Sequence, residues 1–134
     1  MDGGIRLLVL SDRGVDFQNV GVPMLLAVGA VHHHLRRVGK RMKASLICET
    51  GEARDVHQIA CLIGFGASCV DPYLACMRPL RELIEKGSVD PDFGKGVFNY
   101  KNALENGLLK IMSKMGISLV SSYRGAQIFE AIGI

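Results

Sequence analysis

Residues 22–39, with the sequence VPMLLAVGAVHHHLRRVG, are the stretch from which the rest of the chain can be placed. Pro23 stands where a first helical position would be, which tolerates its missing N–H, and Gly39 follows the last apolar residue as a C′ glycine does. Between them, apolar residues recur every three or four positions, as on one stripe of an amphipathic helix: Met24, Val28, Val31, Leu35 and Val38. We therefore predict an amphipathic helix here.

The first turn of this helix is apolar nearly all round, because Leu25 and Leu26 lie off the stripe. Such a turn needs cover on a second side, either from another element of this chain or from a partner surface. We therefore treat Leu25 and Leu26 as interface candidates.

Three consecutive histidines lie in the same helix. At about 100° per residue, His33 points away from the apolar stripe, while His32 and His34 flank it on opposite sides. Three neighbouring residues of a regular helix cannot converge on one metal ion, since ligand pairs need i, i+3 or i, i+4 spacing. We expect no metal site here but histidines wedged between packed elements, with His33 as an interface candidate.

The composition is that of one globular domain. The chain has 134 residues, 49% of them hydrophobic and 22% charged, and a net charge of +3. No basic run is longer than Arg36 and Arg37, so the sequence gives no support for nucleic-acid binding. No apolar stretch approaches about 18 residues and no signal peptide is visible, so we expect a soluble, cytoplasmic protein and no membrane partner.

The four cysteines form no CxxC pair, and their spacings are poor for zinc or an iron–sulfur cluster. They are Cys48, Cys61, Cys69 and Cys76. Since Cys48 and Cys69 fall in strand-like runs and Cys61 in a helix-like one, we interpret them as buried free thiols.

Four short apolar runs are predicted as strands, at residues 5–10, 44–48, 67–70 and 117–120. The first is a nearly continuous apolar run, typical of a strand buried on both faces. Helices are expected over residues 22–39, 55–63, 71–86, 99–115 and 126–132, with a loop at 87–96 and Asp71 as an N-cap before Pro72. Strands that alternate with amphipathic helices predict an α/β fold: a four-stranded, mainly parallel sheet with flanking helices, either a three-layer α/β unit or half of a β/α barrel.

Polar residues follow the predicted strands, where ligands bind in such folds. The binding candidates are Ser11, Asp12, Arg13, Glu49, Glu52, Asp71, Ser122 and Arg124. They could position an anionic substrate or perform acid–base chemistry, or they could be helix caps, turn formers and salt links. His57 is either a general base or a surface histidine. No motif identifies a catalytic residue.

Two further residues near the end of the chain are interface candidates. Lys114 could reach an anion or a neighbouring domain, or it could be a solvated lysine that the helix dipole favours. Leu109, beside the apolar stripe of the same predicted helix, is a candidate for apolar surface left uncovered.

Several segments, in order and over nearly the whole chain, resemble glutamate synthase. They are LLVLSDR at 7–13, residues 22–39, ETGEARDVHQIA at 49–60, GFGAS at 64–68, DPYLA at 71–75 and GLLKIMSKMGISLVSSYRGAQIFEAIGI at 107–134. The matching part of that family is the central domain of the large subunit, between the glutaminase domain and the FMN-binding barrel. The resemblance implies that residues 1–134 are one segment of this central domain.

The resemblance also implies a function. Glutamate synthase converts glutamine, 2-oxoglutarate and a reductant to two glutamates, and the central domain is a scaffold that links the glutaminase and FMN sites around the ammonia route. FMN and an iron–sulfur cluster belong to the parent enzyme. Met1 is followed by Asp2, so no cysteine stands as an N-terminal nucleophile, and the family's closely spaced cysteine triplet is absent. We therefore expect no catalytic residue and no cofactor in this segment.

Two functional hypotheses follow. In the first, the chain is a structural segment whose partners are the glutaminase and FMN-binding domains, located in the cytoplasm or, in a plant or alga, the plastid. In the second, it is a free-standing half-barrel module that binds a small anionic metabolite at the strand-end loops.

Overall fold

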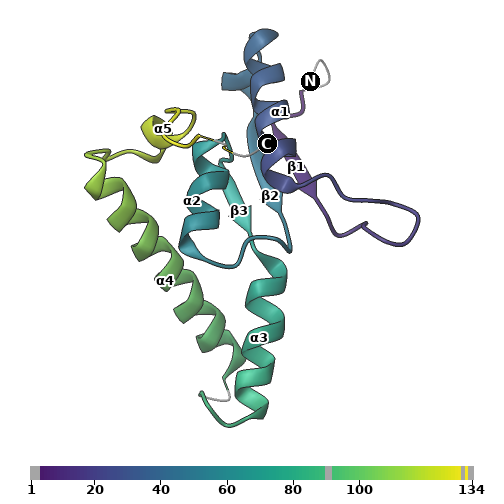
Figure 1. The fold of residues 1–134 in the computed structure, drawn as a ribbon, viewed down its shortest axis with the longest axis vertical. Coiled ribbons are helices and arrows are strands. Elements are labelled where there is room, and N and C mark those ends of the chain that lie inside the picture. Colours follow the sequence, from purple (N-terminus) through teal and green to yellow (C-terminus); the bar gives the residue numbers. More distant parts are fainter. Residues whose placement is uncertain (1–3, 90–91, 131, 133–134) are drawn as a thin grey trace.

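The computed structural model describes residues 4–89, 92–130 and 132. Three parallel strands form one sheet in the order β1-β2-β3: β1 (Leu7–Ser11), β2 (Ser45–Glu49) and β3 (Cys69–Asp71). The helices are α1 (Met24–Arg37), the 3₁₀ turn η1 (Arg41–Lys43), α2 (Val56–Gly64), α3 (Tyr73–Glu85), α4 (Phe93–Lys114) and α5 (Val120–Tyr123) (Figure 1). The predicted α/β class with a parallel sheet and flanking helices is confirmed.

One face of the sheet packs against α1 and α2 and forms the core. Residues paired across parallel strands point to the same face, so Leu8 lies beside Leu46, and Leu10 beside Cys48. Leu46 and Cys48 are fully buried, as is Val28 of α1. Three side chains of the predicted α1 stripe, among them Met24 and Val28, are buried, so the amphipathic pattern was interpreted correctly.

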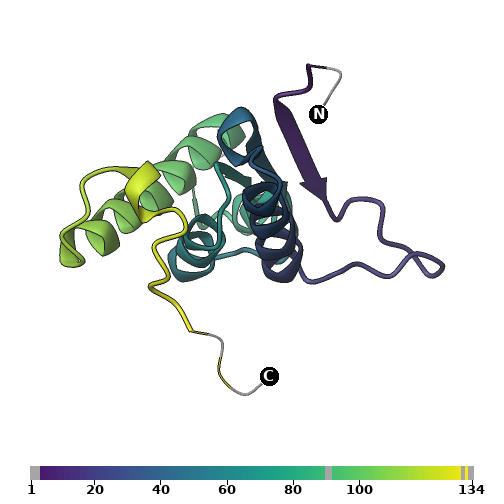
Figure 2. The same ribbon diagram turned by 90° about the horizontal axis from the view of Figure 1, so that it is seen from above.

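The opposite face of the sheet is open. Leu7 and Val9 on β1 are 63% and 58% exposed, and Cys69 on β3 is exposed. The predictions that residues 5–10 are buried on both faces and that Cys69 is a buried thiol are therefore wrong for the described chain. The physical reason is that no described element covers this face, and β1 is an edge strand (Figure 2).

The limits of α1 follow from its terminal residues. Pro23 is the N-cap and Met24 the first helical residue, so the prediction of Pro23 as the first helical position is wrong by one residue. At the other end, Gly39 N donates to Arg36 O at 3.0 Å and Lys40 N to Leu35 O at 2.8 Å, with Gly39 at φ 67°. This is a Schellman motif, so the prediction of Gly39 as the C′ residue is confirmed.

The next helices begin differently from the prediction. A capping box joins Asp55 and Gln58 at the start of α2. Asp71 belongs to β3, and α3 starts after Pro72, so Asp71 is not the N-cap.

The predicted loop over residues 87–96 is too long, because α4 already begins at Phe93, with Asp92 accepting a hydrogen bond from Lys95 N. Gly96 was interpreted as a loop residue. It instead lets α4 approach α3, since a Cβ there would lie 2.6 Å from a methyl of Leu80.

The last quarter of the chain departs most from the prediction. Residues 117–119 pair with no strand, α5 follows, and residues 126–130 and 132 form neither helix nor strand. The predicted fourth strand and final helix are therefore wrong for the described residues, while residue 131 lies outside them. The reason is tertiary: Tyr123 is fully buried, and Gly125 N donates to Gly64 O at 2.8 Å, which ties this segment across the end of α2.

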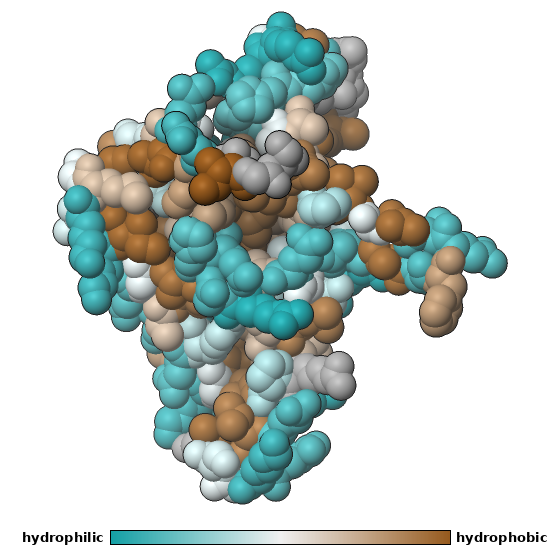
Figure 3. All heavy atoms as spheres, viewed as in Figure 1, coloured by the Kyte–Doolittle hydropathy of each residue, from teal (hydrophilic) through white to brown (hydrophobic). Residues whose placement is uncertain are grey.

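A long loop, residues 12–23, projects from the body of the molecule in both ribbon views (Figures 1 and 2). Four hydrophobic side chains on it are more than half exposed and contribute brown surface to the projection in Figure 3: Val15, Phe17, Val20 and Val22. Among the described residues, no helix is both long enough and apolar enough to cross a membrane.

Candidate functional site

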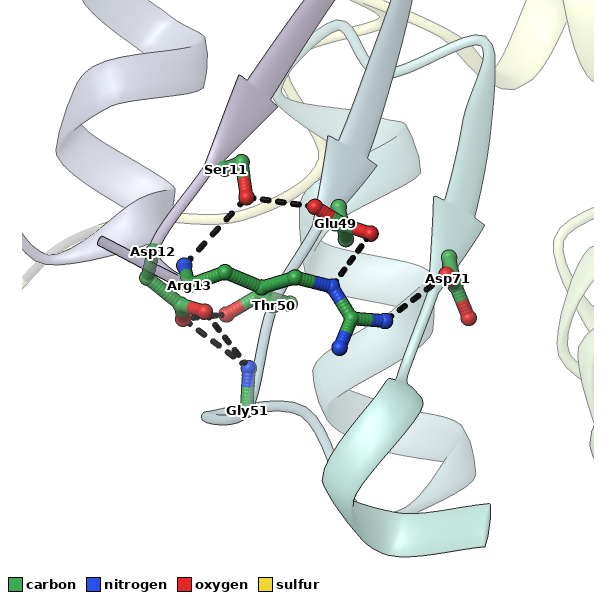
Figure 4. A network of polar contacts seen from close by, with 7 residues as sticks. All are labelled: Ser11, Asp12, Arg13, Glu49, Thr50, Gly51 and Asp71. Carbon is green, nitrogen blue, oxygen red and sulfur yellow. Dashed lines mark hydrogen bonds and ion pairs between the residues drawn. The ribbon is translucent and has the colours of Figure 1, made fainter. Parts of the chain in front are cut away.

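The carboxyl ends of the three strands bring five of the predicted site residues into one neighbourhood, as the parallel topology requires (Figure 4). These are Ser11, Asp12, Arg13, Glu49 and Asp71, and together with Thr50 and Gly51 they form the carboxyl-end network.

Asp12 ties the loop after β1 to the loop after β2. Its carboxylate accepts hydrogen bonds from Thr50 Oγ1 at 2.6 Å and from Gly51 N at 2.9 Å, and Thr50 is fully buried. Burial alone would raise the pKa of Asp12, but hydrogen bonds from Thr50, Gly51 and Tyr73 outweigh it and hold the pKa below its ordinary value. The carboxylate is therefore ionised and fully engaged.

Glu49 at the end of β2 binds two residues of the β1 loop. Ser11 Oγ donates to Glu49 Oε2, and Arg13 Nε donates to Glu49 Oε1 at 2.5 Å. The hydrogen bonds from Ser11 and then from Arg13 lower the pKa of Glu49. The guanidinium of Arg13 also lies 3.9 Å from the ring centroid of Tyr73 and 4.0 Å from Asp71. Arg13 thus connects all three strand ends.

Glu52 lies outside this network and binds the start of α1. Its Oε2 accepts a hydrogen bond from the backbone N–H of Met24 at 2.9 Å. A carboxylate at this position satisfies a free N–H of the first turn of α1 and complements the helix dipole. The structure thus places Glu52 as a cap for α1 supplied from another loop.

Two predicted site residues lie elsewhere, because the fourth strand does not form. Ser122 is exposed on α5. Arg124 lies towards the amino end of the sheet, where its Nη1 donates to Ser68 Oγ at 2.7 Å. Neither joins the carboxyl-end network.

The interface candidates differ in exposure. Leu26 and Leu109 are 55% and 58% exposed, whereas Leu25 is partly buried against the core. His33 and Lys114 are exposed, and the His33 ring meets that of His32 edge-on at 5.4 Å. Four of these five residues therefore offer surface, and their role in docking stays a prediction.

A second polar region, which the sequence did not predict, lies at the amino end of the sheet. Buried His32 accepts a hydrogen bond at Nδ1 from Arg41 Nε at 2.9 Å. Arg41 also donates to Ala44 O at 2.7 Å and Gly66 O at 2.8 Å. The sequence did contain a signal for this region. Basic residues lie between α1 and β2, and residues that directly precede a parallel strand lie at the amino end of the sheet.

The described His, Cys, Asp and Glu side chains do not form a metal site. In the described part of the chain, no group of three His, Cys, Asp or Glu side chains is placed to hold a metal ion. Cys48 points into the core, whereas Cys69 lies on the open face, so these two cysteines do not fit one iron–sulfur cluster.

A comparison with protein families gives the context of this geometry. The model of the glutamate synthase central domain matches residues 1–134. The chain belongs to this family.

Whole glutamate synthases are also similar to it. The NADPH-dependent large chain of Bacillus subtilis is 50% identical over 98% of this chain, and ferredoxin-dependent glutamate synthase 2 of Synechocystis is 48% identical over all of it. The NADH-dependent enzyme of Schizosaccharomyces pombe is 46% identical over 98%. The chain spans 9%, 9% and 6% of these relatives. The central-domain segment is thus common to synthases whose names give three different reductants.

For a glutamate synthase central domain, the carboxyl-end network is best understood as structural. Carboxylates with lowered pKa values, such as Asp12 and Glu49, are poor proton acceptors near neutral pH. Their hydrogen bonds join the loop after β1 to the end of β2 and the loop that follows it.

Proposed function

We propose that this chain is a structural segment of a glutamate synthase, and that its open sheet face packs against another part of the same polypeptide. The parent enzyme would convert glutamine, 2-oxoglutarate and a reductant to glutamate, with FMN and an iron–sulfur cluster held outside residues 1–134. The parent would act in the cytoplasm or, in a plant or alga, in the plastid, since a rice relative is named chloroplastic.

The open sheet face carries this proposal. It consists of Leu7, Val9, Ile47 and Cys69, which the strand register places on one side. Parallel sheets of α/β proteins are normally covered on both faces, because their strands are apolar on both. Here only one face is covered within the described residues, while the relatives are more than ten times longer than this chain. The missing layer is therefore supplied by the rest of the polypeptide.

The segment would act as a scaffold between the glutaminase and FMN-binding parts of the enzyme, around the ammonia route. Two features support this role. The carboxyl-end network fixes the strand ends, and the exposed leucines Leu26 and Leu109 offer apolar contacts away from the sheet. A scaffold needs such a rigid body with several apolar surfaces.

The alternative of a free-standing module that binds an anionic metabolite at the strand ends finds less support. The carboxyl end carries more carboxylates than cations, and Asp12, Glu49 and Glu52 already accept hydrogen bonds within the chain. An anion bound there would be repelled by these carboxylates, and the donors that hydrogen-bond to them would not be free to bind it.

The reactivity of Cys69 tests the proposal directly. In the 134-residue chain, iodoacetamide should label exposed Cys69 quickly and buried Cys48 slowly, because burial raises the pKa of Cys48 to about 12. In the complete glutamate synthase, Cys69 should become protected, and peptide mass spectrometry would measure both sites. Rapid labelling of Cys69 in the complete enzyme would contradict the proposal.

A substitution pair on the same face tests the functional part. In the complete enzyme, Val9→Asp should lower the glutamate formed per glutamine hydrolysed, because a carboxylate would enter an apolar interface. Val9→Thr keeps the shape and strand preference of valine and is the matched control. An unchanged ratio in Val9→Asp would argue against a scaffold that couples the two sites.

A further inference from the structure

The amino end of the sheet contains an open cavity of about 1170 Å³, bordered by β1, the end of α1, η1 and the segment after α5. Its described lining includes no Asp or Glu. It includes six cationic side chains: Arg6, Arg36, Lys40, Arg41, Lys43 and Arg124. Lys40 has an interaction partner of its own, and the other five cations make the described wall of the cavity electropositive.

Arg41 is fixed at the cavity wall by neutral partners. Its three hydrogen bonds go to a ring nitrogen of His32 and to the backbone carbonyls of Ala44 and Gly66. Burial and then the neighbouring charge of Arg41 lower the pKa of His32 to about 4, so at neutral pH the ring is uncharged and accepts the bond. The guanidinium is held in place without a compensating negative charge from these partners.

Arg124 is held in a similar way, by a hydrogen bond to the hydroxyl of Ser68. Its charge and that of Arg41 repel each other, and burial followed by this repulsion lowers the pKa of Arg41. Two positioned guanidinium groups whose described partners include no carboxylate form a donor array to which a carboxylate would bind favourably. A concave wall of one charge also focuses the field on an incoming anion.

We infer that this cavity receives a carboxylate-bearing segment of the same glutamate synthase polypeptide, from outside residues 1–134. This inference rests on the proposed function, because it requires the longer parent chain.

Two observations favour a protein segment over a small metabolite as the occupant. The volume exceeds the range of about 300–1,000 Å³ that is typical of small-molecule sites. Leu7 lines the cavity and also belongs to the open sheet face, so the two surfaces are continuous. One neighbouring segment could therefore cover the apolar face with hydrophobic side chains and place Asp or Glu in the cavity.

Zero-length cross-linking of the complete enzyme tests the inference. A carbodiimide joins a lysine amine to a carboxylate only when the two are in contact. We expect Lys43, which is exposed at the cavity, to be joined to an Asp or Glu outside residues 1–134. Lys101, 3.6 Å from Glu105, serves as the internal positive control.

A matched pair of neighbouring arginines gives the specificity control. Arg36 lines the cavity, whereas Arg37, the next residue of α1, does not. Arg36→Glu should lower the yield of the Lys43 cross-link several-fold by repelling the incoming carboxylate, and Arg37→Glu should leave it unchanged. Both residues are exposed, so neither substitution disturbs the core.

The outcomes separate the two proposals. If Cys69 is protected in the complete enzyme but Lys43 forms no external cross-link while Lys101 is joined to Glu105, the proposed function stands and this inference fails. It also fails if citrate or inorganic phosphate protects Lys43 from acetylation and no cross-link forms, since the cavity would then take a soluble anion. If Lys43 is joined outside the segment while Cys69 stays reactive, the cavity inference holds and packing on the open face is wrong.

Discussion

At the carboxyl end of the sheet, Asp12, Glu49 and Glu52 each accept hydrogen bonds from another part of the chain. At the amino end, cationic side chains line a cavity without a carboxylate among its described residues, and the described partners of Arg41 are all neutral. The first end pairs its charged groups within the described segment, whereas the described partners of Arg41 leave its charge uncompensated.

This difference predicts how each end responds to substitution. Removing a polar group that has hydrogen-bond partners in the fold lowers stability, because those partners become unpaired. A polar group that the fold leaves unpaired costs little or even improves stability when it is removed. Stability measurements on variants of the two ends can therefore test this difference.

The largest effect is expected at Gly66, the point where the amino end is most tightly packed. Gly66 has φ 128°, and a Cβ there would overlap the ring of His32. Gly66→Ala should lower the free energy of unfolding by about 3 kcal/mol, through backbone strain and a displaced His32. Urea denaturation of the chain, followed by circular dichroism, would measure the loss.

Gly39→Ala is the matched control, since Gly39 also has a positive φ of 67° but nothing lies within 4 Å of the added Cβ. Its cost should be only about 1 kcal/mol, from the left-handed backbone alone. Equal losses for the two variants would show that packing of His32 over Gly66 contributes nothing.

Asp12→Ala should cause the next largest loss, about 2 kcal/mol, because it leaves the buried hydroxyl of Thr50 and the N–H of Gly51 without their acceptor. Asp12→Asn keeps one acceptor oxygen, so its loss of stability should be about half that of Asp12→Ala. The same urea experiment measures both. An unchanged midpoint for Asp12→Ala would mean that the carboxyl end is no more complete than the amino end.

The sequence predicted the parts of the fold that local patterns determine. The apolar stripe between Pro23 and Gly39 placed α1 to within two residues at each end. The run at residues 117–120 does not form the predicted strand, although β1 and β3 are edge strands with room to pair, because strand preference depends on tertiary context. Here the burial of Tyr123 against α2 determines the conformation instead.

The site was predictable to the same extent. The rule that parallel strands end at one edge correctly brought Ser11, Asp12 and Glu49 together. It misplaced Arg124, because that prediction depended on a strand that does not form. The cationic cavity was missed because its cations come from separate parts of the chain: Lys40, Arg41 and Lys43 lie close together in the sequence, but the fold is needed to bring Arg6, Arg36 and Arg124 to them.

The two ends should also titrate separately. The folded pKa of His32 is about 4, below its ordinary 6.5, so the unfolded chain takes up this proton first and stability falls as the pH drops from 6.5 to 4. The cavity is open to solvent, so we expect a loss of about 1–2 kcal/mol, less than the full shift would give. The pKa values of Asp12 and Glu49 are also lowered, from 3.8 and 4.5, so their contribution is lost as the pH falls below these values, from the lower end of the His32 range downwards.

The variant His32→Asn isolates the amino-end titration, because its Oδ1 can accept the hydrogen bond from Arg41 but does not titrate. The variant should be less stable at pH 7, since its side chain is smaller, and its free energy of unfolding should change less between pH 6.5 and 4. A pH dependence as steep as that of the unmodified chain would assign this titration to other groups.

The smallest expected effect is a gain of stability, whereas the other substitutions lower it. The hydroxyl of Tyr123 is buried and has no hydrogen-bond partner in the part of the chain that the structure describes. Tyr123→Phe keeps the ring, which meets Phe129 edge-on at 6.4 Å, and removes the unpaired group. Stability should therefore rise by up to about 1 kcal/mol, whereas the removal of a polar group at Asp12 lowers it. A loss of stability in Tyr123→Phe would show that this hydroxyl does have a hydrogen-bond partner. The polar groups near the amino end would then be paired, as those around Asp12 are, and the difference between the two ends would be smaller.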